Sequence, residues 1–364
     1  MVLAPFHAAR TQLGRSLKLL VLGGTSFLGP AIVNAAMAGH EVTLFNSGRT
    51  NPRLFPELEL IKGDRSPHAP VLTGLQRTRA WDAVIDVWPF DPHVVAATAR
   101  LLQDRVARYV FVSTTVVYKN LVVPRAAESD LLFDDMTDAS AWYEYDKAQC
   151  ERVLQTLYGA RHAVCRSHIT NGYRNANDTL RMWAVRTNRG GEVLAPGRGD
   201  DPVQFTDVKD VGQFVVRMAD HGLSGAYNVA GPAAGTVTFR TFERVNAACG
   251  NRATLTWVNE DFLEEQRILA FSDLAMWIPV RTARRPGVMQ VSRAKALSAG
   301  LTFRPLGATT EDELNWFREH MAPDYESGAG SSNKGFSMER ERALLSAWHR
   351  TRPESDLGRP QTRS

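Results

Sequence analysis

The stretch LLVLGGTSFLGP, residues 19–30, predicts a strand, a tight turn and the start of a helix. Four apolar residues run into Gly23 and Gly24, and after Gly29 and Pro30 apolar residues recur at helical spacing. A glycine at the start of such a turn avoids a Cβ clash, and one at its end lets the helix pack closely on the strand. The N–H groups of the helix N-terminus then suit a pyrophosphate. Taken alone, the stretch is either a dinucleotide-binding turn or only a turn.

The composition is that of a globular protein with one elaborated domain, or a domain and a half. The chain has 364 residues, of which 44% are hydrophobic and 23% charged. Its apolar runs are shorter than the roughly 18 residues that a membrane helix needs, which argues against a transmembrane segment. The net charge is only +4 and the basic residues are not gathered in one block, so nucleic-acid binding is not indicated.

The cysteines argue against a disulfide framework and against a zinc site. Cys150, Cys165 and Cys249 form no CxxC pair, and we expect a reducing, cytoplasmic environment and no bound metal. Seven Lys among 43 basic residues is typical of a GC-rich genome, which predicts a bacterial protein. Residues 1–16 lack the apolar core of a secretory signal and are expected to form a flexible leader, with a cleaved targeting peptide as the alternative.

Short apolar runs alternate with helical patterns through the first half of the chain. This order predicts an α/β fold of the Rossmann type, a doubly wound parallel sheet covered on both faces by helices. Further strands are predicted at residues 41–45, 58–61, 83–87, 109–113 and 163–166, and helices at residues 93–102 and 141–157.

The second half is more irregular and predicts a smaller C-terminal substrate-binding lobe. We expect the NAD(P)-binding domain at residues 17–166 and the lobe mainly at residues 167–322, partly interleaved with it. A hairpin-like segment is predicted at residues 190–197, and helices are predicted at residues 211–220, 241–248 and 311–319. Residues 323–364 are expected to hold a linker at 327–334, an amphipathic helix at 337–350 and a disordered tail.

Tyr143 and Lys147 are the residues that point to chemistry. Their spacing of four places both side chains on one face of a helix. An ammonium ion close to a phenol favours the phenolate and lowers the pKa of the tyrosine toward working pH. Tyr143 could then exchange a proton with a substrate hydroxyl or carbonyl. Thr114 follows the fifth strand, at the edge where an open parallel sheet binds its ligands, although a threonine there could equally cap a turn.

Together these motifs resemble an extended short-chain dehydrogenase/reductase of the NAD(P)-dependent epimerase/dehydratase family. The resemblance runs from about residue 18 to residue 317. It rests on six motifs in the family's order: GGTSFLG (23–29), GD (63–64), FVSTTVVY (111–118), YEYDK (143–147), FTDVKDVG (205–212) and YNVAG (227–231). It implies an NAD(P)-dependent enzyme and a homodimer formed through the helices near His93 and Tyr143.

The resemblance also implies roles for single residues. Tyr143 would be the acid/base, Lys147 its modulator and a ligand of the nicotinamide ribose, and Thr114 the residue that orients the substrate. Asp64 would contact the adenine. The full set of implied or inferred cofactor-binding residues is Gly23, Gly24, Thr25, Ser26, Phe27, Leu28, Gly29, Asn46, Ser47, Arg49, Asp64, Val87 and Lys147.

The end of the second strand favours NADP over NAD. Members that prefer NAD often place an acid there, whereas this chain has Asn46, followed by Ser47 and Arg49. An arginine at this point can bind a 2′-phosphate, although Arg49 could also be a solvated turn residue.

Departures from the family pattern bear on the substrate. Dehydratases of the family carry an acid pair where this chain has Thr115 and Val116, which argues against dehydration. Nucleotide-sugar epimerases place an Asn and an Arg where this chain has Ile169 and Val203, which puts a nucleotide-sugar substrate in doubt. The nearby polar residues that could substitute are Asn171, Arg181 and Arg186.

Two further residues of the lobe, His168 and Trp183, are candidates for the substrate site, as is Thr115. His168 is either a second acid/base or a packing residue, and Trp183 either shapes a pocket or belongs to the core.

Three functions remain open. The first is an NAD(P)-dependent oxidoreductase that interconverts a secondary alcohol and a ketone on a small polar metabolite. The alternative is an epimerase of a sugar or nucleoside-like substrate, which uses the same residues and returns the hydride. The third is a binding protein similar to chloroplast stem-loop RNA-binding relatives, against which the presence of Thr114, Tyr143 and Lys147 together argues.

Overall fold

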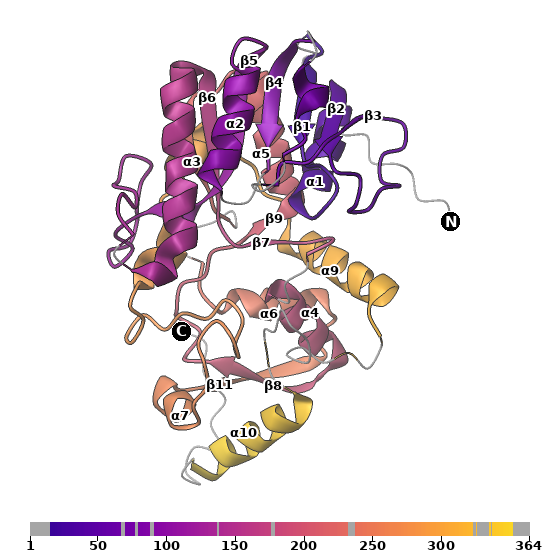
Figure 1. Ribbon diagram of the computed structural model, residues 1–364. Coiled ribbons are helices and arrows are strands. Elements are labelled where there is room, and N and C mark those ends of the chain that lie inside the picture. Colours follow the sequence, from indigo (N-terminus) through magenta and orange to yellow (C-terminus); the bar gives the residue numbers. More distant parts are fainter. Residues whose placement is uncertain are drawn as a thin grey trace. The chain divides into compact units, whose positions relative to one another are not determined.

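The structure is a computed structural model in which the chain forms two compact units (Figure 1). It describes residues 15–66, 70–76, 79–87, 91–136, 138–175, 179–231, 237–322, 325, 335 and 337–351. The first unit consists of Met1–Ser113, Asp134–Cys165 and Val211–Tyr227, and the second of Thr114–Phe133, Arg166–Asp210 and Asn228–Ser364. The chain therefore passes between the units several times.

A seven-stranded sheet confirms the predicted Rossmann-type fold. Its order is β10-β6-β5-β4-β1-β2-β3, and β1 pairs in parallel with both β2 and β4. The strands are β1 (Lys18–Leu22), β2 (Glu41–Asn46), β3 (Glu59–Lys62), β4 (Trp81–Asp86), β5 (Val106–Thr114), β6 (His162–Ser167) and β10 (Gly225–Val229). Because β1 lies between its neighbours with its four apolar residues at most 1% exposed, it is an interior strand of the sheet.

Helices cover both faces of this sheet (Figure 1). They are α1 (Leu28–Met37), α2 (Pro92–Leu102), α3 (Trp142–Tyr158) and α5 (Val208–Asp220). On one face α2 and α3 bury Val95, Ala99 and Leu154 in a core with strand residues such as Leu20 and Phe111. On the other face α5 packs against α1, because a Cβ at Gly212 would lie 2.7 Å from the carbonyl of Ala31.

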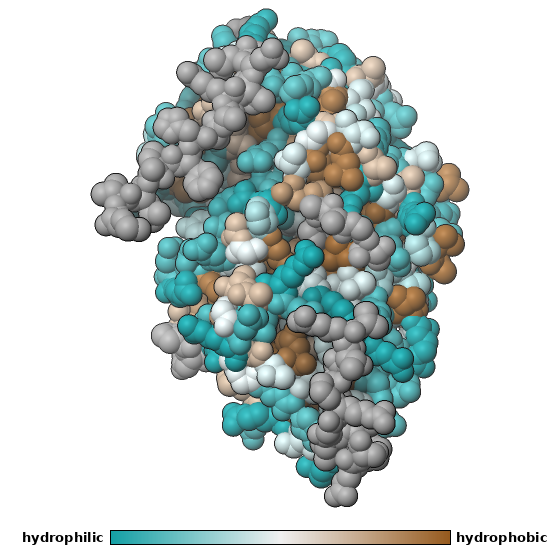
Figure 2. All heavy atoms as spheres, turned by 180° about the vertical axis from the view of Figure 1, so that it is seen from behind, coloured by the Kyte–Doolittle hydropathy of each residue, from teal (hydrophilic) through white to brown (hydrophobic). Residues whose placement is uncertain are grey.

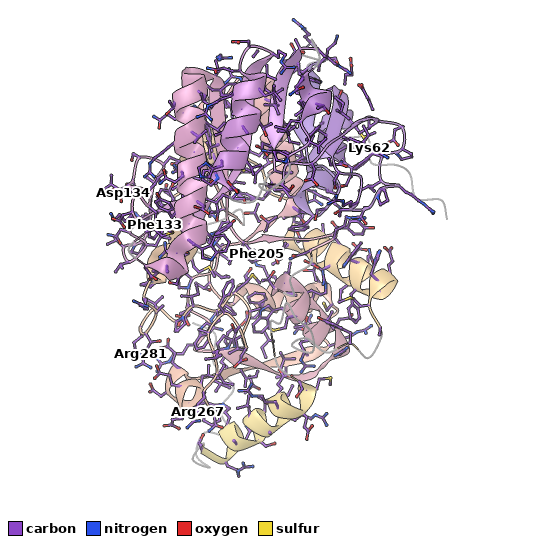
Figure 3. The ribbon with its side chains drawn as sticks, in the orientation of Figure 1. Lys62, Phe133, Asp134, Phe205, Arg267 and Arg281 are labelled. Carbon is purple, nitrogen blue, oxygen red and sulfur yellow. The ribbon has the colours of Figure 1, made fainter. Side chains whose placement is uncertain are left out.

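The outer edge of the sheet is β3. Lys62, labelled in Figure 3, is its last residue, and it stands opposite Asn46 of β2. The strand ends where Gly63 donates a hydrogen bond to the carbonyl of Asn46 and where Asp64 forms a short antiparallel bridge with Val71. Asp64 therefore lies just past the carboxyl end of β3, as the sequence predicts.

The second unit has its own core. Its helices are α4 (Thr179–Arg189), α6 (Thr241–Ala248), α7 (Glu260–Glu265), α8 (Ala294–Ser298), α9 (Leu306–His320) and α10 (Met338–Thr351). Its strands form two parallel pairs, β8 (Gly191–Pro196) with β11 (Ala253–Val258) and β7 (Thr170–Asn171) with β9 (Thr206–Asp207). Phe205, labelled in Figure 3, and Trp183 both stack on Phe242 in this core.

The prediction of a hairpin-like segment at residues 190–197 is wrong. Residues 191–196 form the single strand β8, whose partner β11 runs parallel to it and follows only after α6. A parallel pair requires a long crossover connection, which a local glycine pattern does not reveal. Helix α4 was not predicted either, because its residues 179–187 are all buried and show no polar face from which a helical period could be read.

The amphipathic C-terminal helix is present as α10. Leu344 and Leu345 are buried in the core of the second unit, and the ring of Trp348 lies 5.2 Å from that of Phe262. Glu341 of the same helix forms a buried ion pair with Arg186 of α4. The apolar stripe of this helix therefore packs on the second unit of its own chain. The leader up to residue 14, the predicted linker at 327–334 and the tail after residue 351 lie outside the described residues.

Across the described residues, no helix is both long and apolar enough to cross a membrane. On the face of the molecule in Figure 2, hydrophilic side chains predominate among the coloured residues and apolar ones form separate small patches.

The Gly-rich turn depends on a close backbone contact that a side chain would prevent. A Cβ at Gly29 would lie 2.5 Å from the Cα of Gly24, so the first turn of α1 packs directly on the end of β1. We predict that Gly29→Ala lowers the free energy of unfolding by about 2 to 3 kcal/mol, measured by urea denaturation. Gly39→Ala is the matched control, because a Cβ at Gly39 has no neighbour within 4 Å. Equal stability of the two variants would contradict the close packing.

Candidate active site

Hydrogen bonds from the end of β2 and from the segment after it fix the Gly-rich turn. Gly23 and Gly24 have φ angles of +112° and +96°, which L side chains rarely adopt. Asn46 donates from Nδ2 to the carbonyl of Gly23 at 2.9 Å, and Asn51 donates to the carbonyl of Thr25 at 2.7 Å. The amide of Asn46, predicted to contact the cofactor, thus braces the turn in this structure.

Arg49 and Asp64 form an ion pair at the carboxyl edge of the sheet. Arg49 Nη1 lies 3.3 Å from Asp64 Oδ2, and 80% of the Arg49 side chain is exposed. The other carboxylate oxygen of Asp64 accepts a hydrogen bond from the backbone N–H of Ser66 at 2.8 Å. Both residues therefore stand where the sequence predicts them, after β2 and after β3, and Arg49 remains accessible to an anionic group.

A pocket of about 110 Å³ lies beside this edge, between the segment after β3 and helix α2. It is mainly apolar and is lined by Arg65, Ser66, Pro70, Leu72, His93, Val94, Ala97 and Thr98. The base of the pocket is rigid, because the Arg65 guanidinium makes two hydrogen bonds to the carboxylate of Asp86, at 2.6 and 2.8 Å. Tyr109 donates a third to Asp86 at 2.6 Å.

The Arg65–Asp86 pair was missed by the sequence analysis. Burial lowers the pKa of Arg65, but the charge and hydrogen bonds of Asp86, with smaller influences of Tyr109 and Cys150, together leave the pKa raised, so the guanidinium stays charged. The available signal was an acid at the carboxyl end of the fourth strand, 21 residues after the arginine of the segment GDR, residues 63–65. A buried pair of this kind is costly to break, which suits a fixed wall of a binding site.

Helix α3 carries both predicted catalytic residues, in the first unit. Lys147 is only 3% exposed, and its Nζ donates to the carbonyl of Val112 on β5 at 2.7 Å and lies 4.5 Å from the ring centre of Phe111. Tyr143 lies one turn earlier, with its ring 5.9 Å from that of Trp142. The helix therefore presents both residues where β5 ends.

The predicted effect of Lys147 on Tyr143 does not appear in this structure. The pKa of Tyr143 is raised, first by burial and then by Glu144 and Cys150. The physical reason lies in the side chain of Lys147, whose ammonium binds the Val112 carbonyl. Burial lowers the pKa of Lys147 itself to about 8. At neutral pH the site therefore holds a protonated phenol and an ammonium ion.

In the second unit, Thr114 and Thr115 begin the segment that follows β5. Thr114 Oγ1 accepts a hydrogen bond from the N–H of Val116 at 3.4 Å and caps a short 3₁₀ helix, Thr115–Val117. Thr115 is fully buried, and its Oγ1 lies 2.6 Å from Nδ1 of His168. Thr114 thus has the turn-capping role that the sequence left open, while its side chain is only partly buried.

His168 is a packing residue. Its Nε2 lies 3.4 Å from the sulfur of Met289, and burial lowers the pKa of the imidazole to about 4. An imidazole with such a pKa is neutral at physiological pH, and its two nitrogens already contact Thr115 and Met289. These contacts favour the structural role over that of a second acid or base.

The other predicted substrate residues have structural partners within the second unit. Asn171 is fully buried and its Oδ1 accepts from the N–H of Leu180 at 3.0 Å. Arg181 is 2% exposed and lies 3.3 Å from the carboxylate of Glu313. Trp183 is fully buried and donates from Nε1 to the carbonyl of Ala275. Trp183 is thus a core residue, and the two polar side chains hold neighbouring segments together.

Arg285 is a cation that the sequence analysis missed. Its Nη2 donates to the carbonyls of Val116 and Tyr118, at 3.3 and 3.0 Å, and its guanidinium lies 5.6 Å from the ring centre of Phe133. It therefore fixes the segment directly after Thr114. Its position 167 residues beyond Tyr118 gives no local signal.

The first unit fits a dinucleotide. Gly23 has no room for a side chain, because a Cβ there would overlap Cγ2 of Val87, and Gly29 is closed against Gly24. This cradle of bare backbone ends at the N-terminus of α1, which attracts a pyrophosphate. Among the described residues, no group of three or more His, Cys, Asp or Glu side chains could hold a metal ion.

The buried imidazole of His168 predicts a pH dependence of stability. Because its folded pKa, about 4, lies below the unfolded value of 6.5, the unfolded chain binds more protons between these values. Stability should therefore fall by up to about 3 kcal/mol as the pH drops through this window. Comparison of urea unfolding with His168→Gln isolates this contribution, and His221→Gln at an exposed site is the control. A His168 C2-proton NMR signal that titrates near 6.5 would contradict the expectation.

Comparison with known proteins is consistent with this geometry. A family model described as the NAD dependent epimerase/dehydratase family matches residues 19–230. No curated protein matches the chain. One similar solved structure is UDP-N-acetylglucosamine 4-epimerase from Bacillus cereus, with 16% identity, a TM-score of 0.59 and coverage of 83% of this chain and 99% of that one.

Two further solved structures are also similar to this chain. A UDP-glucose 4-epimerase has 14% identity and a TM-score of 0.61, with coverage of 85% of this chain and all of that one. The Bordetella bronchiseptica enzyme WbmH, solved in complex with NAD⁺, has 19% identity and a TM-score of 0.58, with 85% and 100% coverage. At these identities the structures show the shared fold, and the match of the family model over more than half of the chain shows the family. This chain belongs to the NAD-dependent epimerase/dehydratase family and is an NAD(P)-dependent enzyme.

Proposed function

We propose that this enzyme epimerises a carbinol centre of a polar, hydroxylated substrate, with Tyr143 as its acid/base. The observation that carries the proposal is the placement of Tyr143 and Lys147 by one helix, one turn apart, at the end of β5 in the unit that holds the Gly-rich turn. The comparisons favour this alternative over the net oxidoreduction that the sequence analysis put first, because the similar structures are sugar-nucleotide epimerases.

The residues divide the chemistry between them. A nicotinamide cofactor held at the Gly-rich turn would supply reversible hydride transfer at the carbinol carbon. Tyr143 takes the proton of the hydroxyl as the ketone forms and gives it back to the same oxygen. Because burial raises its pKa, the phenol must first lose its own proton to solvent, and the phenolate so formed is then a strong base for the substrate hydroxyl. Lys147 supplies a positive charge in the same low-dielectric environment.

The cofactor would be held by the edge of the first unit. The backbone of residues 23–29 would bind the pyrophosphate, with Val87 beside Gly23, and Asp64 would contact the adenine. The pocket lined by Arg65 and Thr98 is available to the base, with α2 as its apolar wall. Arg49, with most of its side chain exposed, supports NADP as the preferred cofactor, because it could exchange its ion pair with Asp64 for a 2′-phosphate.

The substrate we propose is sugar-like or nucleoside-like but carries no nucleotide diphosphate. Ile169 and Val203 occupy the positions where nucleotide-sugar epimerases place diphosphate ligands. The substitutes considered from sequence are engaged elsewhere, because Asn171 and Arg181 are buried with structural partners and Arg186 pairs with Glu341. Dehydration is disfavoured for a separate reason, since Thr115 and Val116 replace the family's acid pair.

Net oxidoreduction is the second candidate, and the same missing diphosphate ligands favour it, because they distinguish this chain from the epimerases it resembles. The two functions differ in cofactor balance. An epimerase forms an isomer without net absorbance change at the nicotinamide band, whereas a reductase consumes reduced cofactor stoichiometrically. Sugars, nucleosides and ketones screened by both readouts, with the cofactor present, would separate them.

Removal of the Tyr143 hydroxyl should nearly abolish turnover and leave cofactor binding almost unchanged. We expect Tyr143→Phe to lower kcat by about 10² to 10⁴-fold, because the proton transfer then has no donor or acceptor. Affinity for NADP, measured by calorimetry, should change little. The control is Tyr145→Phe, two residues away on the same helix. Full activity of Tyr143→Phe would refute the proposed role.

Arg49 should decide between the two nicotinamide cofactors. We expect Arg49→Gln to weaken NADP binding by about tenfold or more, which corresponds to the loss of a charge-assisted hydrogen bond, and to leave NAD binding unchanged. Arg53→Gln, at an exposed position of the same connection, is the matched control. An equal loss for both cofactors, or no loss for NADP, would rule out 2′-phosphate recognition by Arg49.

A further inference from the structure

Two polar contacts join helix α3 to two consecutive residues of β5. Lys147 Nζ donates to the carbonyl of Val112 at 2.7 Å, and Ser113 Oγ donates to Oε1 of Glu151 at 2.5 Å. Lys147 and Glu151 are four residues apart, so they share one face of the helix. The register of α3 against the end of β5 is therefore set by a cation and an acid together.

The side chains of Lys147, Glu151 and Ser113 are all buried. Lys147 is 3% exposed, Glu151 is 5% exposed and Ser113 is 2% exposed. A buried charge is expensive unless an opposite charge or hydrogen bonds compensate it. Glu151 is no part of the catalytic pair, and its burial beside Lys147 calls for a reason.

The charges around Lys147 identify that reason. Burial lowers its pKa to about 8, and the opposing, raising influences come from Cys150, Asp86, Glu151 and Cys165. The two thiols have pKa values of about 12 and are neutral at physiological pH. Asp86 and Glu151 are the two carboxylic acids of this set.

The two carboxylates differ in their other partners. Asp86 is bound by the Arg65 guanidinium through two hydrogen bonds, so much of its charge is balanced. Glu151 is hydrogen-bonded by the hydroxyl of Ser113, which carries no charge. Glu151 is the one of the two that lies on α3 itself, four residues from Lys147 and on the same face of the helix.

We propose that Glu151, held by Ser113, is a positioning residue of the active site that keeps buried Lys147 as an ammonium ion and fixes it at the end of β5. This inference rests on the proposed function for its catalytic meaning, since Lys147 must be charged to assist Tyr143. The Ser113–Glu151 contact makes the acid part of the site although it need not touch substrate or cofactor.

The test measures the protonation of Lys147 directly and needs no activity. The chain has seven lysines, so ¹³Cε-labelled lysine gives few NMR signals, and the signal of Lys147 is the one that Lys147→Arg removes. In full-length Glu151→Gln, which keeps the shape and removes the charge, we expect the titration midpoint of Lys147 to fall by about one pH unit. Glu151→Asp should restore most of the midpoint, and exposed Asp104→Asn should leave it unchanged.

A folded Glu151→Gln variant with an unmoved Lys147 midpoint would overturn the proposal. If Glu151→Gln does not fold, Ser113→Ala replaces it, because it keeps both charges and releases the carboxylate. The Lys147 midpoint should then fall by a few tenths of a pH unit, and no movement would again overturn the proposal.

Cofactor binding separates this inference from the proposed function. The pH at which NADP affinity declines on the alkaline side should move with the Lys147 midpoint in Glu151→Gln. If the midpoint moves but the wild-type chain binds neither NAD nor NADP, the influence of Glu151 on Lys147 stands and the proposed function fails. If both cofactors bind and the midpoint does not move, the proposed function stands and Glu151 is only a structural residue.

Discussion

The contact between Gly29 and Gly24 is the constraint on which the nucleotide-binding edge depends. It brings the first turn of α1 onto the end of β1 with no side chain between them, and so leaves backbone N–H groups open toward a ligand. The positive φ angles of Gly23 and Gly24 follow from the same turn. Asn46 and Asn51 then brace it from the next connection, so that a loop made mostly of small residues is held by hydrogen bonds to its carbonyls.

Away from that edge, buried arginine–acid pairs join segments that are distant in the sequence. Arg65 meets Asp86 in the first unit, and in the second unit Arg181 meets Glu313 and Arg186 meets Glu341. Such pairs add little net stability against apolar replacements, but removal of one partner leaves a buried charge. They therefore specify which segments meet. In the second unit this role occupies Arg181 and Arg186, the two arginines that the sequence offered as ligands of a diphosphate.

The sequence predicted those parts of the molecule whose signals are local. The Gly-rich turn, the strand order leading to Asp64 and the spacing of Tyr143 and Lys147 were all readable, because each depends on residues a few positions apart. The pairing of β8 with β11, the all-buried helix α4 and the Arg65–Asp86 pair were not, because they depend on contacts between distant segments. The lowered pKa expected for Tyr143 failed for a similar reason: helical spacing puts Lys147 on the correct face, but the carbonyl of Val112 decides where its ammonium points.

The protonation states of the buried groups bear on which reaction the site suits. Burial keeps the Tyr143 phenol and the His168 imidazole neutral at physiological pH. In an epimerisation the proton that leaves the hydroxyl returns to the same oxygen, so one acid/base that holds the proton between the two hydride transfers is sufficient. Net oxidation must instead deliver that proton to solvent, either from the partly buried Tyr143 itself or through a relay. His168 is the histidine that the sequence offered as a second acid or base, and its pKa of about 4 and its packing against Met289 make it unsuited to such a relay. The fate of this proton therefore separates the two reactions, and the neutral, packed imidazole of His168 provides no relay for it.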